Sequence, residues 1–356
     1  MKILHVIDSL EMGGAEKMLI DFIKQYKYSY KQDSHYVVSL NDRNPLLKEI
    51  RPLIDDFACL RFHKLTFWKA AYQLNRYIKK WKVDTIHSHL FYATIVARLA
   101  RSFNNNIRFV TTYHNMEYCS ESPFYSWKLP FIDKLTVPRS NYHPIFITKP
   151  VADCITSQIP GISNFTILSN FVSKEYCPKY QFKNNGQLRL VAIGNLSTVK
   201  NHIYILKEIK MLNDKRVCLD IYGKGDLDKE LTSFIKEHAL QVQLKGHAKI
   251  SSELLSNYDA FLMSSLSEGM PLALIEAIVT GLPSIVTDLP QLRETAEDAA
   301  IYFELKEGKL CSILEQLLTD KTTLKYMAEK TERLREKFQV KDYVDAVRNI
   351  YSQVEL

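Results

Sequence analysis

Residues 264–288 read Ser264-Ser-Leu-Ser-Glu-Gly-Met-Pro-Leu-Ala-Leu-Ile-Glu-Ala-Ile-Val-Thr-Gly-Leu-Pro-Ser-Ile-Val-Thr-Asp288. This pattern predicts the end of a strand, a turn, a helix, a second turn and another strand. Pro271 suits the first helical position, Gly281 suits the position after the last turn, and Pro283 prevents the helix from continuing. The residues between Pro271 and Gly281 are apolar on every side of the helix, so we expect it to be buried.

One carboxylate, Glu276, lies inside this buried helix, and a second, Glu268, lies just before it. Because a buried unpaired charge is strongly unfavourable, Glu276 needs a hydrogen-bonding partner. We expect the two carboxylates to lie roughly 10 Å apart, on either side of the free N–H groups at the helix N-terminus. Two acceptors of hydroxyl donors flanking an anion site fit a sugar, a diphosphate and a ribose. The alternative is a buried helix with two structural carboxylates.

The stretch resembles the retaining GT-B glycosyltransferases of family four, also called glycosyltransferase group 1. The resemblance rests on Glu-Gly-Met-Pro at residues 268–271, the second glutamate eight positions after the first, and Gly-Leu-Pro-Ser-Ile-Val-Thr-Asp behind it. It implies an α/β fold of two Rossmann-like, doubly wound parallel-sheet domains that face a central cleft. It also implies that Glu268 lies at the donor sugar and that Glu276 binds the ribose hydroxyls. The donor-binding residues carried over here are Gly269, Met270, Pro271, Leu272 and Glu276.

The length and composition indicate a globular chain with two domains. A chain of 356 residues exceeds one small core, and 46% hydrophobic with 24% charged residues is ordinary. Six cysteines without a C-x-x-C pair or a metal-ligand spacing are typical of a reducing compartment, so we expect a cytoplasmic protein. The segment Met1–Asp8 predicts a strand rather than a signal peptide, because His5 and Asp8 interrupt any apolar core. No run approaches the ~20 apolar residues of a membrane-spanning helix.

The first half of the chain is basic. Residues 1–186 carry 25 Lys and Arg against 15 Asp and Glu, whereas the remaining residues carry 22 against 25. The segment Arg61–Lys82 holds seven cations and no acid, and aromatics and cations recur in Ser122–Phe131. Because a Lys or Arg near an anionic leaflet contributes about 1 kcal/mol, we expect peripheral contact with an anionic membrane surface. The apolar residues at helical spacing predict a helix whose other face packs on the sheet: Phe67, Ala71, Leu74, Ile78 and Trp81.

Nucleic acid would also suit a basic patch. No recognisable nucleic-acid-binding module accompanies the patch in this sequence, however. We therefore expect no nucleic-acid partner.

Strands and helices alternate from the first residue. A strand over Lys2–Ile7 leads through Gly13 and Gly14 into a helix over Ala15–Tyr28, and more strands follow. Repeated βαβ units predict a parallel, doubly wound sheet, in which ligands gather at the carboxyl ends of the strands. The further strands are predicted over His35–Leu40, Ala58–Phe62, Asp84–Ser88 and Arg108–Thr112.

Two features lie at these carboxyl ends. Gly13 and Gly14 let backbone N–H groups approach an anion, although a simple turn is the alternative and no G-x-G-x-x-G fingerprint supports a nicotinamide site. The resemblance implies that these glycines face the donor diphosphate and that His114 lies near the transferred sugar. His89 is a weaker candidate, and His87 is given no role. The alternative for all three histidines is a hydrogen-bonded loop residue.

The second half begins with a strand over Leu188–Gly194. Lys200, six residues later at a helix start, is placed to reach a phosphate as a compact charge; a surface lysine near a helix cap is the alternative. The family usually has Gly-Arg-Leu with a lysine downstream, and both cations neutralise the leaving diphosphate. This chain keeps Lys200 but has Asn195 at the arginine position, which leaves one fewer fixed charge.

Two glycine loops complete the implied donor site. Gly223 and Gly225 follow a strand over Val217–Tyr222 and match the family's Gly-x-Gly loop beside the nucleotide. His247 ends the stretch 242–247, which matches the strand whose following backbone reads the nucleobase. Asn195 is carried over into the same site. After Asp288, Leu289-Pro290 replaces the Gly-Gly that the family often has.

These features predict the domain organisation. Residues 1–170 form an acceptor-binding domain, the polar residues 171–187 form a linker, and residues 188–338 form a nucleotide-sugar-binding domain. The resemblance implies that a C-terminal helix within residues 339–356 packs back on the first domain.

The resemblance predicts a retaining glycosyltransferase of the hexosyltransferase class. It would move a sugar from a nucleotide-diphosphate sugar, with UDP as the expected nucleotide, to a glycan or lipid-linked acceptor of bacterial capsule or lipopolysaccharide biosynthesis. The expected catalytic residues are Glu268, Lys200 and His114. No Asp-x-Asp stands at a strand end, so we expect no metal and no other cofactor. A nucleotide-sugar 2-epimerase and a non-catalytic GT-B partner subunit remain the alternatives.

Overall fold

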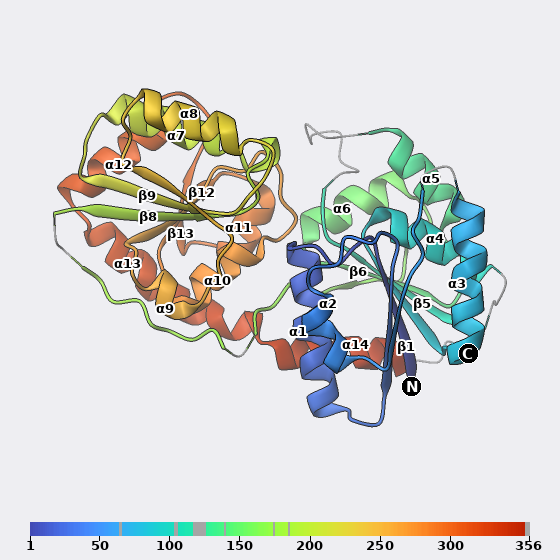
Figure 1. Cartoon of the computed structure of the whole chain (residues 1–356). Helices are drawn as coiled ribbons and strands as arrows, with labels where there is room; N and C mark the ends of the chain where they lie inside the picture. Colours follow the sequence, from blue (N-terminus) through green and yellow to red (C-terminus); the bar gives the residue numbers. More distant parts are fainter. Residues whose placement is uncertain are drawn as a thin grey trace. The chain divides into compact units, whose positions relative to one another are not determined.

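The computed structural model describes residues 1–63, 66–102, 106–116, 126–138, 140–173, 175–183 and 186–352. The chain forms two compact units, of which unit 1 comprises Met1–Phe171 with Val340–Leu356 and unit 2 comprises Val172–Gln339. Each unit is a sheet with helices on both of its faces (Figure 1). The predicted α/β fold with two doubly wound sheets is therefore confirmed.

Unit 1 contains seven strands: β1 Lys2–Ile7, β2 Ser34–Ser39, β3 Asp56–Cys59, β4 Thr85–His89, β5 Arg108–Tyr113, β6 Tyr142–Phe146 and β7 Thr166–Ile167. The sheet has the order β3-β2-β1-β4-β5-β6-β7, and neighbouring strands are parallel. The order reverses between β1 and β4, the point at which ligands bind in such sheets. The helices of this unit are α1 Gly14–Ser29, α2 Leu47–Ile50, η1 Arg51–Leu53, α3 Phe67–Trp81, α4 Phe91–Arg101, α5 Lys128–Thr136, α6 Lys149–Gln158 and α14 Val340–Ser352.

Helix α3 has the predicted amphipathic form. Ala71, Leu74, Ile78 and Trp81 are buried in the core that α3 and α4 form with one face of the sheet. The helix ends at Lys82, which has a left-handed φ of 54°. Of the basic segment Arg61–Lys82, residues 64 and 65 lie outside the described residues, as do residues 122–125 of the aromatic segment.

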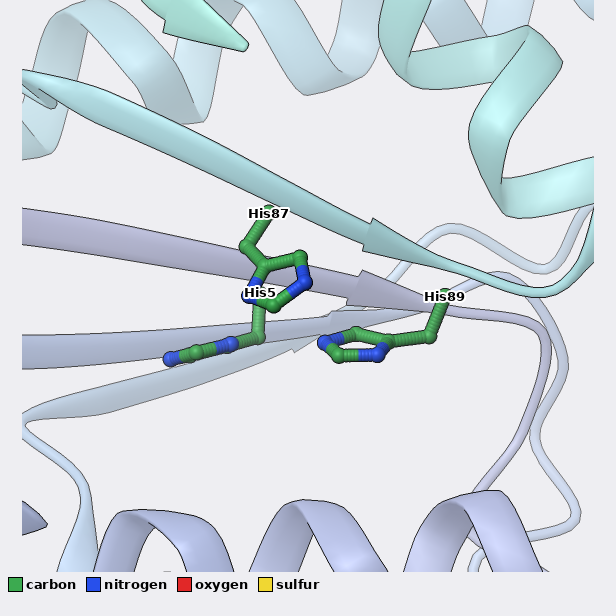
Figure 2. A group of neighbouring side chains, drawn as sticks. All are labelled: His5, His87 and His89. Atoms are coloured by element: carbon green, nitrogen blue, oxygen red, sulfur yellow. The ribbon is translucent and has the colours of Figure 1, made fainter. Parts of the chain in front are cut away.

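Helices α1 and α14 cover the other face of the sheet (Figure 1). Phe22 of α1 and Tyr343 of α14 make an edge-to-face contact with ring centroids 6.0 Å apart. Three histidines from β1 and β4 are buried in this layer, and their rings lie close together (Figure 2). These residues are His5, His87 and His89.

Unit 2 contains six strands: β8 Leu188–Ile193, β9 Val217–Tyr222, β10 Val242–Gly246, β11 Ala260–Met263, β12 Ser284–Thr287 and β13 Ala300–Phe303. The sheet has the order β10-β9-β8-β11-β12-β13, is parallel, and reverses between β8 and β11. The helices are η2 Thr198–Lys200, α7 His202–Leu212, α8 Asp228–Glu237, α9 Ser252–Leu255, α10 Leu272–Thr280, α11 Pro290–Ala296, α12 Lys309–Thr319, α13 Thr322–Thr331 and η3 Glu332–Phe338.

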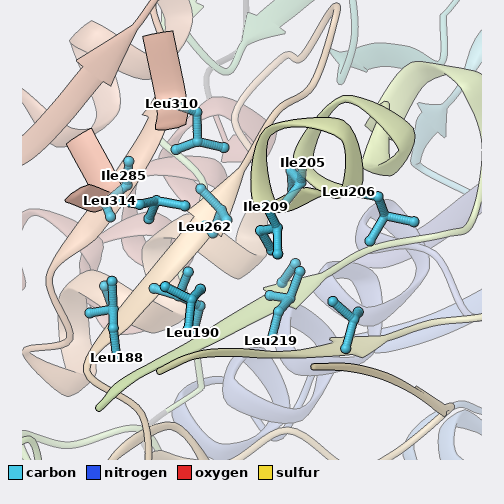
Figure 3. Packing of buried hydrophobic residues seen from close by; sticks show 14 of the residues in the cluster. Leu188, Leu190, Ile205, Leu206, Ile209, Leu219, Leu262, Ile285, Leu310 and Leu314 are labelled. Carbon is cyan, nitrogen blue, oxygen red and sulfur yellow. The ribbon is translucent and has the colours of Figure 1, made fainter. Parts of the chain in front are cut away.

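Leucine and isoleucine side chains hold one helical layer of unit 2 to its sheet (Figure 3). Leu190 and Leu262 from the strands meet Ile209 of α7 and Leu314 of α12, and all four are at most 4% exposed. Full burial of such a side chain contributes about 1.5–3 kcal/mol. This packing fixes β8 and β11, the two strands whose ends carry the predicted catalytic residues.

Helix α10 begins one residue later than predicted. Pro271 has an extended backbone (φ −71°, ψ 126°), and its carbonyl accepts the N–H groups of Leu274 and Ile275. The proline therefore caps the helix, and its predicted place at the first helical position is wrong. The C-terminal prediction is confirmed, because Gly281 adopts φ +87°, a left-handed conformation that glycine accepts without strain. Glu276 is buried, as predicted.

The chain passes between the two units at Phe171/Val172 and at Gln339/Val340. Within unit 2, the N–H of Cys177 donates to Ser252 Oγ at 3.0 Å. The N–H groups of Lys179 and Tyr180 both donate to the carbonyl of Thr280, at 3.0 and 3.1 Å. This part of the segment 171–187 is therefore bonded to α9 and α10.

Two further findings concern the cysteines and the helices. Cys59, Cys177, Cys218 and Cys311 are free thiols, whereas Cys154 in α6 is disulfide-bonded, which the cysteine spacing did not predict. In the part of the chain that the structure describes, no helix combines the length and the apolar character needed to cross a bilayer.

Candidate active site

The loops after β8 and β11 meet where the strand order of unit 2 reverses. Lys200, the last residue of η2, forms an ion pair with Glu268, with 2.5 Å between Nζ and Oε1. Ser265 Oγ donates to the same carboxylate oxygen at 2.6 Å. The loops are also joined by the N–H of Leu266, which donates to the carbonyl of Val199 at 2.8 Å. The structure thus brings two of the predicted catalytic residues into direct contact.

The glycine loops beside this pair are held backbone to backbone. The N–H of Gly194 donates to the carbonyl of Tyr222, and the N–H of Gly223 donates to that of Gly246, both at 2.9 Å. Gly223 has φ +152°, and a Cβ at this residue would lie 1.9 Å from the carbonyl oxygen of Gly194. A Cβ at Gly225 would lie 2.4 Å from a neighbouring carbonyl oxygen. Glycine is therefore required at both positions because the loops approach so closely.

The remaining predicted donor residues of unit 2 surround these loops. Gly269 and Met270 are buried between Glu268 and α10, and Leu272 is the first residue of that helix. Asn195 and His247 are exposed in the loops that follow β8 and β10. Asn195 brings no charge to its loop, so Lys200 is the permanent cation there.

His202 lies at the start of α7, two residues after Lys200. Burial lowers the pKa of His202 to about 4, and the nearby charge of Lys200 acts in the same direction. The imidazole is consequently neutral at pH 7. It adds no second cation beside Lys200.

Glu276 has a protein partner that the sequence analysis missed. The hydroxyl of Tyr176 lies 2.9 Å from Glu276 Oε1 and 2.9 Å from the carbonyl oxygen of Ile250. A tyrosine hydroxyl carries one proton, so it can donate to one of these acceptors at a time. The tyrosine in Glu175-Tyr176-Cys177 is the available sequence signal, but the segment has no periodicity that would orient it.

The carboxyl edge of unit 1 holds Gly13 beside a buried glutamate. Gly13 caps α1, and Glu16 of the first turn folds back so closely that a Cβ at Gly13 would lie 2.2 Å from Glu16 Oε2. Burial, the main cause, together with the neighbouring carboxylates Glu11 and Asp8, raises the pKa of Glu16 to about 7. Gly14, the first residue of α1, is exposed.

His114 follows β5 at the same edge of unit 1. Its Nε2 lies 3.3 Å from Nδ1 of His89, the last residue of β4. Burial lowers the pKa of His114 to about 4, so the side chain is a neutral hydrogen-bonding group at pH 7. The structure therefore joins the stronger and the weaker histidine candidates in one contact.

Solved structures share the fold of the whole chain. HepE from Anabaena, in complex with UDP and glucose, has a TM-score of 0.82 at 17% identity and covers 99% of this chain and 100% of its own. TarM from S. aureus, solved with UDP among its ligands, has a TM-score of 0.78 at 13% identity, with 99% and 100% covered. The two units thus have the GT-B glycosyltransferase fold.

Sequence profiles identify the family. The profile of Glycosyltransferase Family 4 matches residues 12–176, and that of Glycosyl transferases group 1 matches residues 174–337. The chain therefore belongs to the GT-B glycosyltransferases of the family 4 and group 1 type, as the resemblance predicted, and is a glycosyltransferase enzyme.

Curated relatives extend over most of the chain. The capsular polysaccharide biosynthesis glycosyltransferase CapH of Staphylococcus aureus is 21% identical over 350 residues, which are 91% of this chain and 93% of CapH. An Escherichia coli enzyme named UDP-Gal:alpha-D-GlcNAc-diphosphoundecaprenol alpha-1,3-galactosyltransferase is 24% identical over 349 residues, covering 87% of this chain and 88% of that enzyme.

Proposed function

We propose that this chain is a retaining glycosyltransferase that moves a sugar from a UDP-sugar to a glycan or lipid-linked acceptor of a bacterial surface polysaccharide. The contact between Lys200 and Glu268 at the switch point of unit 2 carries this proposal. It places a cation and an acceptor of hydroxyl donors beside the N-terminus of α10, which attracts anions. The names of the relatives, which include a capsular enzyme and an enzyme acting on a diphosphoundecaprenol-linked sugar, support the acceptor class.

Donor binding would exchange the partners of the ion pair. The diphosphate takes the place of Glu268 beside Lys200, and Glu268 then accepts a hydrogen bond from a sugar hydroxyl. Glu276 accepts the ribose hydroxyls, with Tyr176 holding the carboxylate in position. The loop residues Asn195, Gly223, Gly225 and His247 border the nucleotide. In unit 1, Gly13 and Gly14 are proposed to contact the diphosphate and His114 the transferred sugar.

The transfer step would proceed on one face of the sugar. The bond between the anomeric carbon and the phosphate oxygen breaks as the acceptor oxygen attacks from the same side. The acceptor proton passes to the departing phosphate oxygen. Lys200 and the amides before α10 stabilise the charge that grows on the diphosphate, a preorganised electrostatic effect. In this proposal the chain supplies these positive groups itself, so neither a metal nor another cofactor takes part in the transfer.

A turnover assay tests the proposal. The purified full-length chain is incubated with labelled UDP- and GDP-sugars, with and without a lipid extract that contains polyprenyl-diphosphate-linked sugars. We expect UDP release that requires the extract, a product that keeps the donor's anomeric configuration by NMR, and no gain from added Mg²⁺ or Mn²⁺. An inverted product would refute retention, and a metal requirement would refute the cofactor-free mechanism.

The same assay separates the alternative functions. A 2-epimerase would convert the donor without any acceptor. A non-catalytic GT-B subunit would leave every donor unchanged, and this alternative is favoured by one observation, the neutral Asn195 at the position where the family has arginine. Either result would contradict the proposed transfer.

We also propose that unit 1 contacts an anionic membrane surface through α5. Trp127, Phe131 and Leu135 follow one another at intervals of four residues and are 64%, 56% and 70% exposed. Lys128 and Lys134 lie on the same helix. Exposed aromatic and aliphatic side chains beside lysines suit the boundary between headgroups and acyl chains.

Sedimentation with vesicles tests this contact. At low salt, the chain should sediment with vesicles that contain phosphatidylglycerol, and the double variant Trp127→Ser/Phe131→Ser should remain in the supernatant. Tyr326→Ser, which removes an exposed aromatic of unit 2, is the matched control and should behave like the wild type. Equal sedimentation of the double variant would refute the proposed surface.

A further inference from the structure

Three imidazoles converge in the interior of unit 1, in the layer between the sheet and helices α1 and α14. His5 of β1 stands opposite His87 of the adjacent strand β4, and His89 follows two residues later on the same face. One ring nitrogen from each histidine lies within 4.8 Å of the others. All three residues are buried, so water at the surface does not compete for these nitrogens.

Two nitrogens of this cluster have no hydrogen-bonding partner among the described residues. Among the residues that the structure describes, no group hydrogen-bonds Nδ1 of His5 or Nε2 of His89. The rings of His5 and His89 lie end to end beneath His87, each with a nitrogen turned toward the other (Figure 2). A buried polar atom left without a hydrogen bond is unfavourable, so this arrangement calls for a ligand.

The opposite nitrogen of each ring is already engaged. Nε2 of His5 lies 3.0 Å from Nδ1 of His35, and Nδ1 of His89 lies 3.3 Å from Nε2 of His114. His87 contacts two hydroxyls, that of Tyr351 through Nδ1 at 2.5 Å and that of Thr112 through Nε2 at 2.8 Å. His5 and His89 thus show the pattern of metal-ligating histidines, in which the nitrogen away from the ion donates its proton to a partner that fixes the tautomer.

We propose that His5, His87 and His89 bind a divalent transition-metal ion, for which Zn²⁺ is the best match. Imidazole nitrogens suit zinc and its neighbours in the first transition row rather than Mg²⁺ or Ca²⁺, which take oxygen ligands. Zinc–nitrogen bonds of about 2.0–2.1 Å in a tetrahedron bring the ligand atoms to roughly 3.4 Å of one another. Because the ligand nitrogens lie within 4.8 Å of one another, the rings close by up to about 1.4 Å around the ion, a water completes the tetrahedron, and His87 gives up one of its two hydroxyl contacts.

Metal binding would also fix the proton positions next to the candidate active site. With the metal on Nε2 of His89, the proton of that ring stays on Nδ1 and is donated to Nε2 of His114. The proton of His114 is then held on its own Nδ1, so its orientation is set. The ion is a structural one and takes no part in glycosyl transfer, so this inference does not depend on the proposed function.

Metal titration tests the site on the untagged, full-length chain, first stripped with a chelator. For each protein we measure three properties: the metal content after gel filtration, the visible absorption with Co²⁺ and the melting temperature. The wild type should retain roughly one Zn²⁺ per chain, give the d–d absorption of tetrahedral Co²⁺, and melt at a higher temperature with Zn²⁺ than without it. His5→Gln and His89→Gln should lose all three properties.

His143→Gln is the matched control, since His143 is a buried histidine of β6 in the same sheet that bonds to Thr166. It should bind metal like the wild type. The inference is overturned if the wild type retains no metal and Zn²⁺ does not change its melting temperature. Water would then be the partner of the two histidine nitrogens. The inference is equally overturned if the two glutamine variants bind as much metal as the wild type. The wild-type measurements decide the matter even if a variant fails to fold.

Discussion

The ionisable side chains at the carboxyl edges of the two sheets are in different environments, an ion pair in unit 2 and buried single groups in unit 1. In unit 2, Lys200 and Glu268 form a direct ion pair between two loops, and both side chains are partly exposed. In unit 1, burial lowers the pKa of His114 to about 4 and raises that of Glu16 to about 7. Desolvation thus favours the uncharged forms of His114 and Glu16 in unit 1, whereas an ion pair joins Lys200 to Glu268 in unit 2. We propose that Lys200 of the ion pair in unit 2 binds the diphosphate and that the neutral imidazole of His114 hydrogen-bonds a sugar hydroxyl.

Buried and exposed ion pairs can be compared in the same way, and loss of a buried pair should have the largest effect on the free energy of unfolding. Arg98 of α4 and Asp133 of α5 form a fully buried pair, and Arg98 also donates to the hydroxyls of Tyr113 and Tyr142 at 2.9 and 2.8 Å. Asp133→Ala leaves the guanidinium buried without its counter-charge, which should lower the free energy of unfolding by about 3–5 kcal/mol in urea denaturation. Asp153→Ala removes the exposed pair with Lys149 and should change it by less than about 1 kcal/mol. Equal effects would contradict the distinction.

Removal of the cation of the ion pair in unit 2 should come next in size. Lys200→Ala should lower kcat by roughly 100–1000-fold, because the growing charge of the leaving diphosphate loses its preorganised partner, while the Kd of UDP rises much less. Steady-state kinetics and calorimetry measure the two quantities. Lys207→Ala, an exposed lysine of α7, is the control and should behave like the wild type. Unchanged turnover of Lys200→Ala would refute its role.

The buried Glu16 of unit 1 should make the free energy of unfolding depend on pH. The pKa of Glu16 is raised by burial, so its protonated form favours the folded state. Its contribution is complete below about pH 4.5 and is lost as the pH rises through about 7, amounting to on the order of 3 kcal/mol. Glu16→Gln should remove this component, so the variant should gain stability over the wild type between pH 5 and pH 8. The free energy of unfolding is measured between pH 5 and pH 8 for the wild type, Glu16→Gln and the exposed control Glu49→Gln. The same pH dependence in the wild type and in Glu16→Gln would contradict the prediction.

The smallest effect is expected from the partner of Glu276. Tyr176→Phe removes one hydrogen bond to the carboxylate, so the Kd of UDP should rise about 3–10-fold while kcat changes little. Isothermal titration with UDP measures this change. Tyr326→Phe, an exposed tyrosine of α13, serves as the comparison. An unchanged Kd would show that Tyr176 does not position Glu276.

Local patterns predicted the parts of the molecule that depend on residues near one another in sequence. The apolar spacing of Leu74 and Ile78 gave the buried face of α3, and Gly281 gave the end of α10. The resemblance assigned Lys200 and Glu268 to one donor site, and their direct ion pair appears only in the structure, where the ends of β8 and β11 lie side by side. The first two features can be predicted from the periodicity of apolar residues and the residues that cap helices.

The remaining features depend on strand pairing and on long-range packing. His5 and His87 face each other only because β1 pairs with β4 in one particular register, which no local pattern specifies. Arg98 lies in a helix where a charged residue normally indicates a solvent-facing position, and its partner Asp133 is 35 residues away. Tyr176 lies in a segment without regular structure. The partners of such side chains can be identified only when the three-dimensional structure is known.

The central claim is that the diphosphate of the donor takes the place of Glu268 at Lys200. A crystal structure of the chain with UDP tests it most directly. The account predicts that Nζ of Lys200 leaves Glu268 for a phosphate oxygen, while the Glu276 carboxylate contacts the ribose hydroxyls. A structure in which UDP is bound elsewhere, with Lys200 still paired to Glu268, would contradict it.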